Sequence, residues 1–127
     1  DPLMLGVALR AKAGPGALFL VSDAMALAGS EADEFALNGR AVRRAGGRLT
    51  LSDGTLAGAD LTLARAVAVM VAAGAPPETA LAMATSVPAR VAGIDAGHLA
   101  PGAPADLVHL SDDFTLRAVW QAGEPLS

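Results

Sequence analysis

The chain has 127 residues, enough for one small domain, and it is 53% hydrophobic, 17% charged and 3% aromatic. That composition is too apolar for a disordered segment, and no window offers the ~18 uncharged apolar residues of a membrane span. The net charge of −4, with a single lysine, argues against nucleic acid as the main partner. The absence of cysteine excludes a disulfide scaffold, an iron–sulfur cluster and a thiolate zinc site. We expect a soluble protein of the cytoplasm that binds neither nucleic acid nor membranes.

The first residues predict a helix followed by a buried strand. Residues 3–12 are expected to form a helix that ends at the glycine-rich turn Ala13–Gly16. The uninterrupted apolar run Ala17–Val21 is typical of a strand buried on both faces, as in a parallel sheet under helices. Residues 25–38 contain glycine, serine and three acidic side chains, so we expect a loop there.

The middle of the chain predicts a hairpin. Two short strands, Ala41–Arg44 and Arg48–Leu51, flank a glycine pair. The acidic residues 31–34 and the basic side chains of the hairpin are interpreted as solvated faces; the basic set is Arg40, Arg43, Arg44 and Arg48.

Helices are predicted next. Residues 61–73 are apolar almost all round, which indicates a buried helix, and Gly74 with Pro76-Pro77 ends it. Shorter helical segments are expected from Pro77 to about Thr85 and from Pro88 to Gly93.

The last third of the chain predicts strands again. Residues 106–110 are expected to form one strand, and residues 115–121 alternate as a half-buried strand does. The whole order of elements is mixed α/β.

Asp23 is the first candidate for a catalytic residue, because it directly follows the predicted buried strand. Barrels and open parallel sheets hold their active groups at the carboxyl ends of strands. A carboxylate there can act as a general base, a general acid or a metal ligand. An aspartate that only caps a turn is the alternative, and position alone favours it.

The other candidates carry less information. His98 and His109 form no metal-binding motif, and two scattered histidines without cysteine cannot complete a zinc site. The segment Gly54–Ala59 could offer backbone N–H groups to a polar or anionic ligand, although glycines there also fit an ordinary turn. No serine lies in a G-x-S-x-G nucleophile motif.

Five motifs follow one another along nearly the whole chain. They are Leu20–Met25, Asn38–Arg40, Asp53–Gly58, Met83–Thr85 with Pro88–Arg90, and Pro101-Gly102 with Ala105–Val108. In order and spacing they resemble the C-terminal third of the N-acetylglucosamine-6-phosphate deacetylases of the amidohydrolase superfamily. The first and third motifs are the specific ones, whereas the last is shared across the superfamily.

The resemblance implies an α/β fold: a C-terminal fragment of a (β/α)₈ TIM-like barrel plus part of a small β-sandwich domain. Residues 1–38 would hold the last barrel strand and the catalytic loop, with Leu18–Val21 as the eighth strand. The other parts would be a β-hairpin, barrel-packing helices and C-terminal sandwich strands, at residues 39–55, 56–95 and 96–127 respectively.

The resemblance also implies a reaction and its residues. Asp23 would take a proton from a metal-bound water that attacks the N-acetyl carbonyl, and would return it to the leaving sugar amine. The products would be glucosamine 6-phosphate and acetate. Leu56, Ala57 and Gly58 match the loop that contacts the substrate, largely through backbone groups. The cofactor would be a divalent metal ion, with zinc the expected one, whose glutamate and histidine ligands in these enzymes precede the part of the barrel matched by this chain.

We therefore expect the chain to be part of a larger protein and to be inactive alone. Its exposed apolar surfaces would pack against the missing N-terminal segment or against other copies in a homo-oligomer. Two alternatives stay open. One is another amidohydrolase, such as a cyclic amidase, dipeptidase or deaminase, and the other is a non-catalytic interaction domain in which Asp23 is a turn residue.

Overall fold

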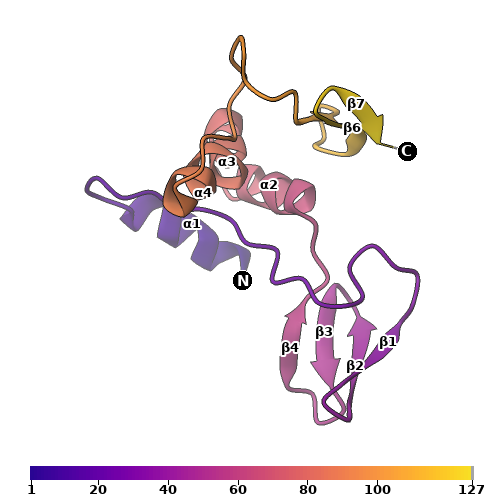
Figure 1. Ribbon diagram of the computed structural model, residues 1–127. Coiled ribbons are helices and arrows are strands. Elements are labelled where there is room, and N and C mark those ends of the chain that lie inside the picture. Colours follow the sequence, from indigo (N-terminus) through magenta and orange to yellow (C-terminus); the bar gives the residue numbers. More distant parts are fainter. Residues whose placement is uncertain (127) are drawn as a thin grey trace. The chain divides into compact units, whose positions relative to one another are not determined.

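The computed structural model describes residues 1–126, which form two compact units. One unit combines residues 1–20 with the chain from residue 64 onward, and the other is the continuous segment 21–63 (Figure 1). Both helices and strands are present, so the mixed α/β class predicted from the sequence is confirmed.

The unit of residues 21–63 is built on a four-stranded antiparallel sheet in which each strand pairs with the next along the chain. The core of this unit consists of Leu27, Val42 and Leu49, each at most 2% exposed. Phe35 and Met25 pack against that core from the strand and the loop that precede the predicted hairpin. The strands are β1 (Glu34–Leu37), β2 (Arg40–Ala45), β3 (Arg48–Leu51) and β4 (Leu56–Ala59).

The predicted hairpin is confirmed as β2 and β3, but the prediction of a loop up to residue 38 is wrong at its end. Residues Glu34–Leu37 form β1, which pairs with β2 through Leu37↔Arg40. The two residues between these strands, Asn38 and Gly39, have φ angles of 50° and 77°. Positive φ at both positions is the type I′ combination, which matches the twist of a two-residue hairpin.

The segment Leu56–Ala59 is also a strand rather than a loop. It forms β4 because β3 offers it a hydrogen-bonding ladder, with Leu49 opposite Gly58 and Arg48 opposite Ala59. As the last strand of the sheet, β4 pairs with a neighbouring strand on one side only.

The other unit contains the helices, and the predicted ones are all confirmed. The side chain of Asp1 caps the first helix by accepting a hydrogen bond from the Leu3 N–H at 2.8 Å. Gly93, in the left-handed conformation, ends the last helix. The helices are α1 (Pro2–Ala11), α2 (Leu63–Ala72), α3 (Pro77–Ala84) and α4 (Ser86–Ala92).

Helix α2 is less buried than its sequence predicts. Ala66, Val67 and Met70 are buried, whereas Leu63 is 40% exposed. Only one face of α2 is buried, because its apolar partners lie on that face. The buried residues of this core are Val67, Met70, Ala75, Ala80 and Met83. Helix α1 likewise leaves Leu3, Met4 and Val7 exposed. No helix among residues 1–126 is long and apolar enough to cross a membrane.

The predicted buried strand Ala17–Val21 is not formed. A strand needs a neighbour to complete its ladder, and none of the described strands pairs with this run. The Leu20 N–H instead donates to the Met83 carbonyl at 2.9 Å, and Leu18 and Leu20 pack on the helical core. Phe19 and Val21 are 44% and 66% exposed, so the prediction of burial on both faces is wrong as well as the prediction of a strand.

A three-stranded antiparallel sheet completes this unit. The two strands expected from the sequence are confirmed as β5 (Leu107–Leu110) and β6 (Leu116–Gln121). A third strand, β7 (Glu124–Leu126), was not anticipated and follows β6 after another two-residue turn, Ala122-Gly123, with φ angles of 50° and 85°.

The Asn38-Gly39 turn gives a test of the sheet. An alanine at Gly39 would meet no atom within 4 Å but would have to keep a φ of 77°. We expect Gly39→Ala to lower the free energy of unfolding by about 1 kcal/mol, because left-handed backbone is costly for residues with a Cβ. Urea unfolding measures this.

Gly16→Ala is the matched control, since Gly16 is outside the left-handed region and its Cβ would make only ordinary contacts with Lys12. We expect it to stay within roughly 0.5 kcal/mol of the wild type. Equal losses in the two variants would contradict the proposed strain at residue 39.

Candidate active site

The structure brings together the site residues predicted from two distant parts of the sequence. The Ala59 N–H donates to the backbone carbonyl of Asp23 at 3.2 Å, which joins the end of β4 to the candidate catalytic residue. Both segments belong to the unit of residues 21–63. Asp23 therefore lies at the end of the strand that contains Leu56, Ala57 and Gly58.

Gly58 is the residue that allows this close approach. A Cβ at this position would lie 3.0 Å from the Asp23 carbonyl oxygen and 2.8 Å from both Cγ and Sδ of Met25. The two Met25 distances are shorter than real Cβ contacts, and the distance to the Asp23 oxygen is tighter than most, so a larger residue would require Met25 and the Asp23 carbonyl to shift. The glycine thus lets the backbone of Asp23 come close to the strand.

Asp23 has an unusual backbone conformation. Its φ is 49°, in the left-handed region. Aspartate tolerates this region better than most residues with a Cβ, and strained positions of this kind concentrate at functional sites. Asp23 is also exposed, so its carboxylate is accessible to a ligand and to water.

Strand β4 offers backbone groups next to that carboxylate. Leu49 pairs with Gly58 and Thr50 with Leu56, so Ala57 is an extra residue without a cross-strand partner. Such bulges re-aim a strand and are frequent beside active sites. Leu56 is 64% exposed. An open strand edge can hydrogen-bond a polar ligand while Asp23 transfers a proton.

The turn that leads into β4 is held by Asp53. One carboxylate oxygen accepts the Thr55 N–H at 2.9 Å, and the other lies 3.2 Å from an Arg40 guanidinium nitrogen. The hydrogen bonds from Thr55, and then the Arg40 charge, lower the pKa of Asp53 from its ordinary value. The charged form of Asp53 is therefore the one that stabilises this turn.

The interpretation of the hairpin arginines as solvated is wrong for Arg44. Its side chain is only 21% exposed, whereas that of Arg43 is 67% exposed. Arg44 lies two residues after the buried Val42 on the same strand, so both face the same side of the sheet. That spacing was the sequence signal, because a charged residue on an inward face needs polar partners.

The two histidines lie in the other unit. His98 is partly exposed, with Nε2 3.9 Å from an Asp95 carboxylate oxygen, and His109 is on β5. Across residues 1–126, no group of three or more histidine, aspartate or glutamate side chains is placed to hold a metal ion. The residues described here thus do not by themselves fit a resident divalent metal.

Comparison with known proteins relates this chain to the amidohydrolase family. The sequence model of the amidohydrolase family matches residues 39–126. The N-acetylgalactosamine-6-phosphate deacetylase of Shewanella sp. (strain ANA-3) is 40% identical in an alignment of 129 positions that covers 98% of this chain and 32% of the relative. The enzyme of the same name from Escherichia coli O157:H7 is 36% identical over 110 residues, 84% of this chain and 29% of that one.

A solved structure of a related deacetylase is also similar to this chain. The N-acetylglucosamine-6-phosphate deacetylase of Pasteurella multocida matches with a TM-score of 0.89 and 30% identity, over 100% of this chain and 34% of that one. The chain therefore spans about a third of the length of these relatives. Asp23 precedes the segment matched by the family model but lies within the structural match.

The packing at Gly58 gives the first test of the site. We expect Gly58→Ala to destabilise the protein by roughly 1–3 kcal/mol, because the added methyl group overpacks against Met25 and the Asp23 carbonyl. Urea unfolding measures the loss. The double variant with Met25→Ala should recover part of it; strictly additive losses would show that the two side chains do not compete for the same space.

The pH dependence of stability tests the turn before β4. Because the pKa of Asp53 is lowered on folding, its contribution is present above the unfolded value of about 3.8 and is lost as the pH falls through the lowered pKa. We expect Asp53→Asn to flatten the acid loss of stability below pH 3.8, measured by urea midpoints over an acid series. Asp33→Asn, an exposed change in the same unit, should keep the wild-type profile.

Proposed function

The chain belongs to the amidohydrolase family, and from that premise we propose that the protein containing it is a deacetylase of N-acetylglucosamine 6-phosphate. The products are glucosamine 6-phosphate and acetate. The observation that carries the proposal is the junction of Asp23 with β4, where the backbone carbonyl of an exposed aspartate accepts the Ala59 N–H at the end of the last strand of the sheet. The names of the relatives support the substrate class, since all are deacetylases of 6-phosphorylated amino sugars.

Asp23 acts as the proton carrier of the proposed reaction. Amide hydrolysis needs a base that deprotonates the attacking water and an acid that protonates the departing amine. One carboxylate can serve both steps, because the proton that it takes from water is the one that it gives to the nitrogen. The new C–O bond forms at the acetyl carbonyl and the C–N bond to the sugar breaks.

Leu56, Ala57 and Gly58 hold the substrate in this proposal. Their support is the edge position and the bulge of β4, together with the exposure of Leu56; Ala57 is half-buried and Gly58 is buried. Specificity would then depend on backbone geometry at least as much as on side chains. A change that moves β4 relative to Asp23 would therefore impair catalysis as well as binding.

The remaining assignments concern the rest of the protein. We propose that residues 1–38 hold the last strand region and the catalytic loop of a (β/α)₈ barrel and that residues 56–95 supply helices that pack on a barrel. Residues 39–55 would be a β-hairpin, and residues 96–127 would be strands of a small β-sandwich domain. The length of the relatives supports this, as do the exposed apolar side chains of α1, which a further segment or a second copy would cover. The divalent metal of the family would take its ligands from outside residues 1–126. The composition favours the cytoplasm as the compartment.

A second substrate is favoured by one observation. The two relatives from Shewanella and Escherichia coli, at 40% and 36% identity, are named for N-acetylgalactosamine 6-phosphate. The Pasteurella multocida structure, at 30% identity, is named for N-acetylglucosamine 6-phosphate. The two sugars differ only in the configuration at C4. Proton transfer by Asp23 would be the same for both sugars, so the two substrates must be distinguished by their rates of acetate release.

Acetate release from each sugar phosphate tests the proposed function. The complete protein that contains residues 1–127, supplied with zinc, should release acetate from N-acetylglucosamine 6-phosphate. Asp23→Asn should lower kcat by roughly two orders of magnitude, because asparagine cannot carry the proton. Asp112→Asn, an exposed change in the other unit, should keep wild-type activity.

Faster turnover of N-acetylgalactosamine 6-phosphate would move the assignment to that sugar. No release from either substrate by the folded, metal-loaded protein would contradict the proposed activity, and wild-type activity in Asp23→Asn would remove Asp23 from the mechanism.

A further inference from the structure

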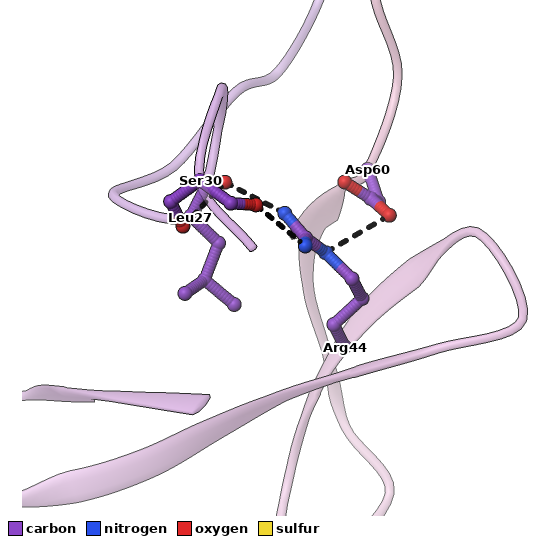
Figure 2. A network of polar contacts seen from close by, with 4 residues as sticks. All are labelled: Leu27, Ser30, Arg44 and Asp60. Atoms are coloured by element: carbon purple, nitrogen blue, oxygen red, sulfur yellow. Dashed lines mark hydrogen bonds and ion pairs between the residues drawn. The ribbon is translucent and has the colours of Figure 1, made fainter. Parts of the chain in front are cut away.

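Arg44 joins three places in the unit of residues 21–63. Its Nη1 donates to the Ser30 carbonyl at 2.9 Å and its Nη2 to the Leu27 carbonyl at 2.6 Å. Its Nε lies 3.1 Å from a carboxylate oxygen of Asp60. Figure 2 shows the guanidinium between the carbonyl groups of the turn and the Asp60 side chain.

The contact with Asp60 is mainly one of charge. Arg44 Nε is buried and has no well-aligned hydrogen-bond partner among the described residues, although the carboxylate oxygen is within ion-pair distance. Both side chains are partly buried, at 21% and 31% exposed. Partial burial reduces solvent screening, so this pair is stronger than a fully exposed one.

The contacts of Arg44 lie on both chain segments that meet at Asp23. One is the segment just after Asp23, where the Ala28 N–H donates to the Met25 carbonyl and the turn carbonyls of Leu27 and Ser30 face the guanidinium. The other is the end of β4, where Asp60 directly follows Ala59. A movement of either segment would change the distance between the Asp23 carboxylate and β4.

We propose that Arg44 is a positioning residue that fixes Asp23 relative to the substrate strand β4. The backbone of Arg44 contributes as well, because its N–H donates to the Asp33 carbonyl at 2.8 Å. Arginine is suited to this role because its planar fork reaches several acceptors at fixed angles, whereas lysine offers one compact charge. The inference rests on the proposed function for its catalytic consequence, but its structural consequence can be measured separately.

The test compares Arg44→Lys with Arg43→Lys in the complete protein. Arg43 is the matched control, since it is the neighbouring residue on β2 and its ion pair with Glu34 is exposed, at 67% and 49%. We expect Arg44→Lys to lower kcat about tenfold with KM changed less than about twofold, because misplaced catalytic groups cost rate more than binding. Amide hydrogen exchange at Ala59 should also speed up about tenfold as the contact with Asp23 loosens.

Arg43→Lys should change neither quantity. A wild-type exchange rate at Ala59 in Arg44→Lys, a loss confined to KM, or equal kcat losses in the two arginine variants would overturn the positioning role. If the wild-type protein releases no acetate, the proposed function fails and the exchange measurement alone decides the role of Arg44.

A second variant covers the case in which Arg44→Lys does not fold. Asp60→Asn removes the charge partner but leaves the Ser30 and Leu27 contacts in place. It should raise Ala59 exchange and lower kcat by roughly threefold, a smaller effect because two of the three contacts remain. Unchanged exchange at Ala59 in Asp60→Asn would overturn the proposal.

Discussion

The hydrogen bond from Ala59 to the Asp23 carbonyl is the interaction on which the candidate site depends. It closes a loop of more than thirty residues and brings a left-handed aspartate next to the end of an edge strand. The bond alone would not fix the geometry. Gly58 lets the two backbones approach, because any Cβ there would collide with Met25 and with the Asp23 carbonyl.

The surrounding sheet supplies the rigidity that such a site needs. Val42 and Leu49 are almost completely buried and hold β2 and β3 in the core. Strand β4 pairs with β3 and is therefore held by hydrogen bonds to an anchored strand. Arg44 uses the same face of β2 to reach the turn after Asp23 and the residue after β4. Catalytic groups are effective only when their supports hold them within a fraction of an ångström. In the proposed function, the hydrophobic core and the arginine contacts would together hold Asp23 in place.

The sequence predicted local structure better than it predicted the partners of each segment. The helices and the Gly46-Gly47 hairpin follow from caps, breakers and turns, which are local signals. The run Ala17–Val21 has the pattern of a buried strand, yet it forms none, and its Leu18 and Leu20 pack against helices. An apolar run by itself does not tell whether its partners are strands or helices. Strand β1 was missed although Asn38-Gly39 is a strong hairpin signal, because the acidic residues before it indicated a loop.

The site was predictable only in part for the same reason. Asp23 and the strand Leu56–Gly58 were chosen from position and from family resemblance, but no spacing in the sequence indicates that they touch. Their approach depends on the β3–β4 register, which includes a bulge at Ala57, and on the contact of Ala59 with the distant Asp23. Arg44 could have been found from its alternation with Val42, since an inward-facing charge on a strand implies buried partners.

Ligand-dependent hydrogen exchange tests the central claim, that Asp23 and β4 form one substrate site. The complete, zinc-loaded protein carrying Asp23→Asn would be compared with and without saturating N-acetylglucosamine 6-phosphate, so that binding is seen without turnover. The site described here predicts slower exchange in both residues 21–30 and residues 56–60, with β5–β7 unchanged. Protection in only one of the two segments, or in neither, would contradict it.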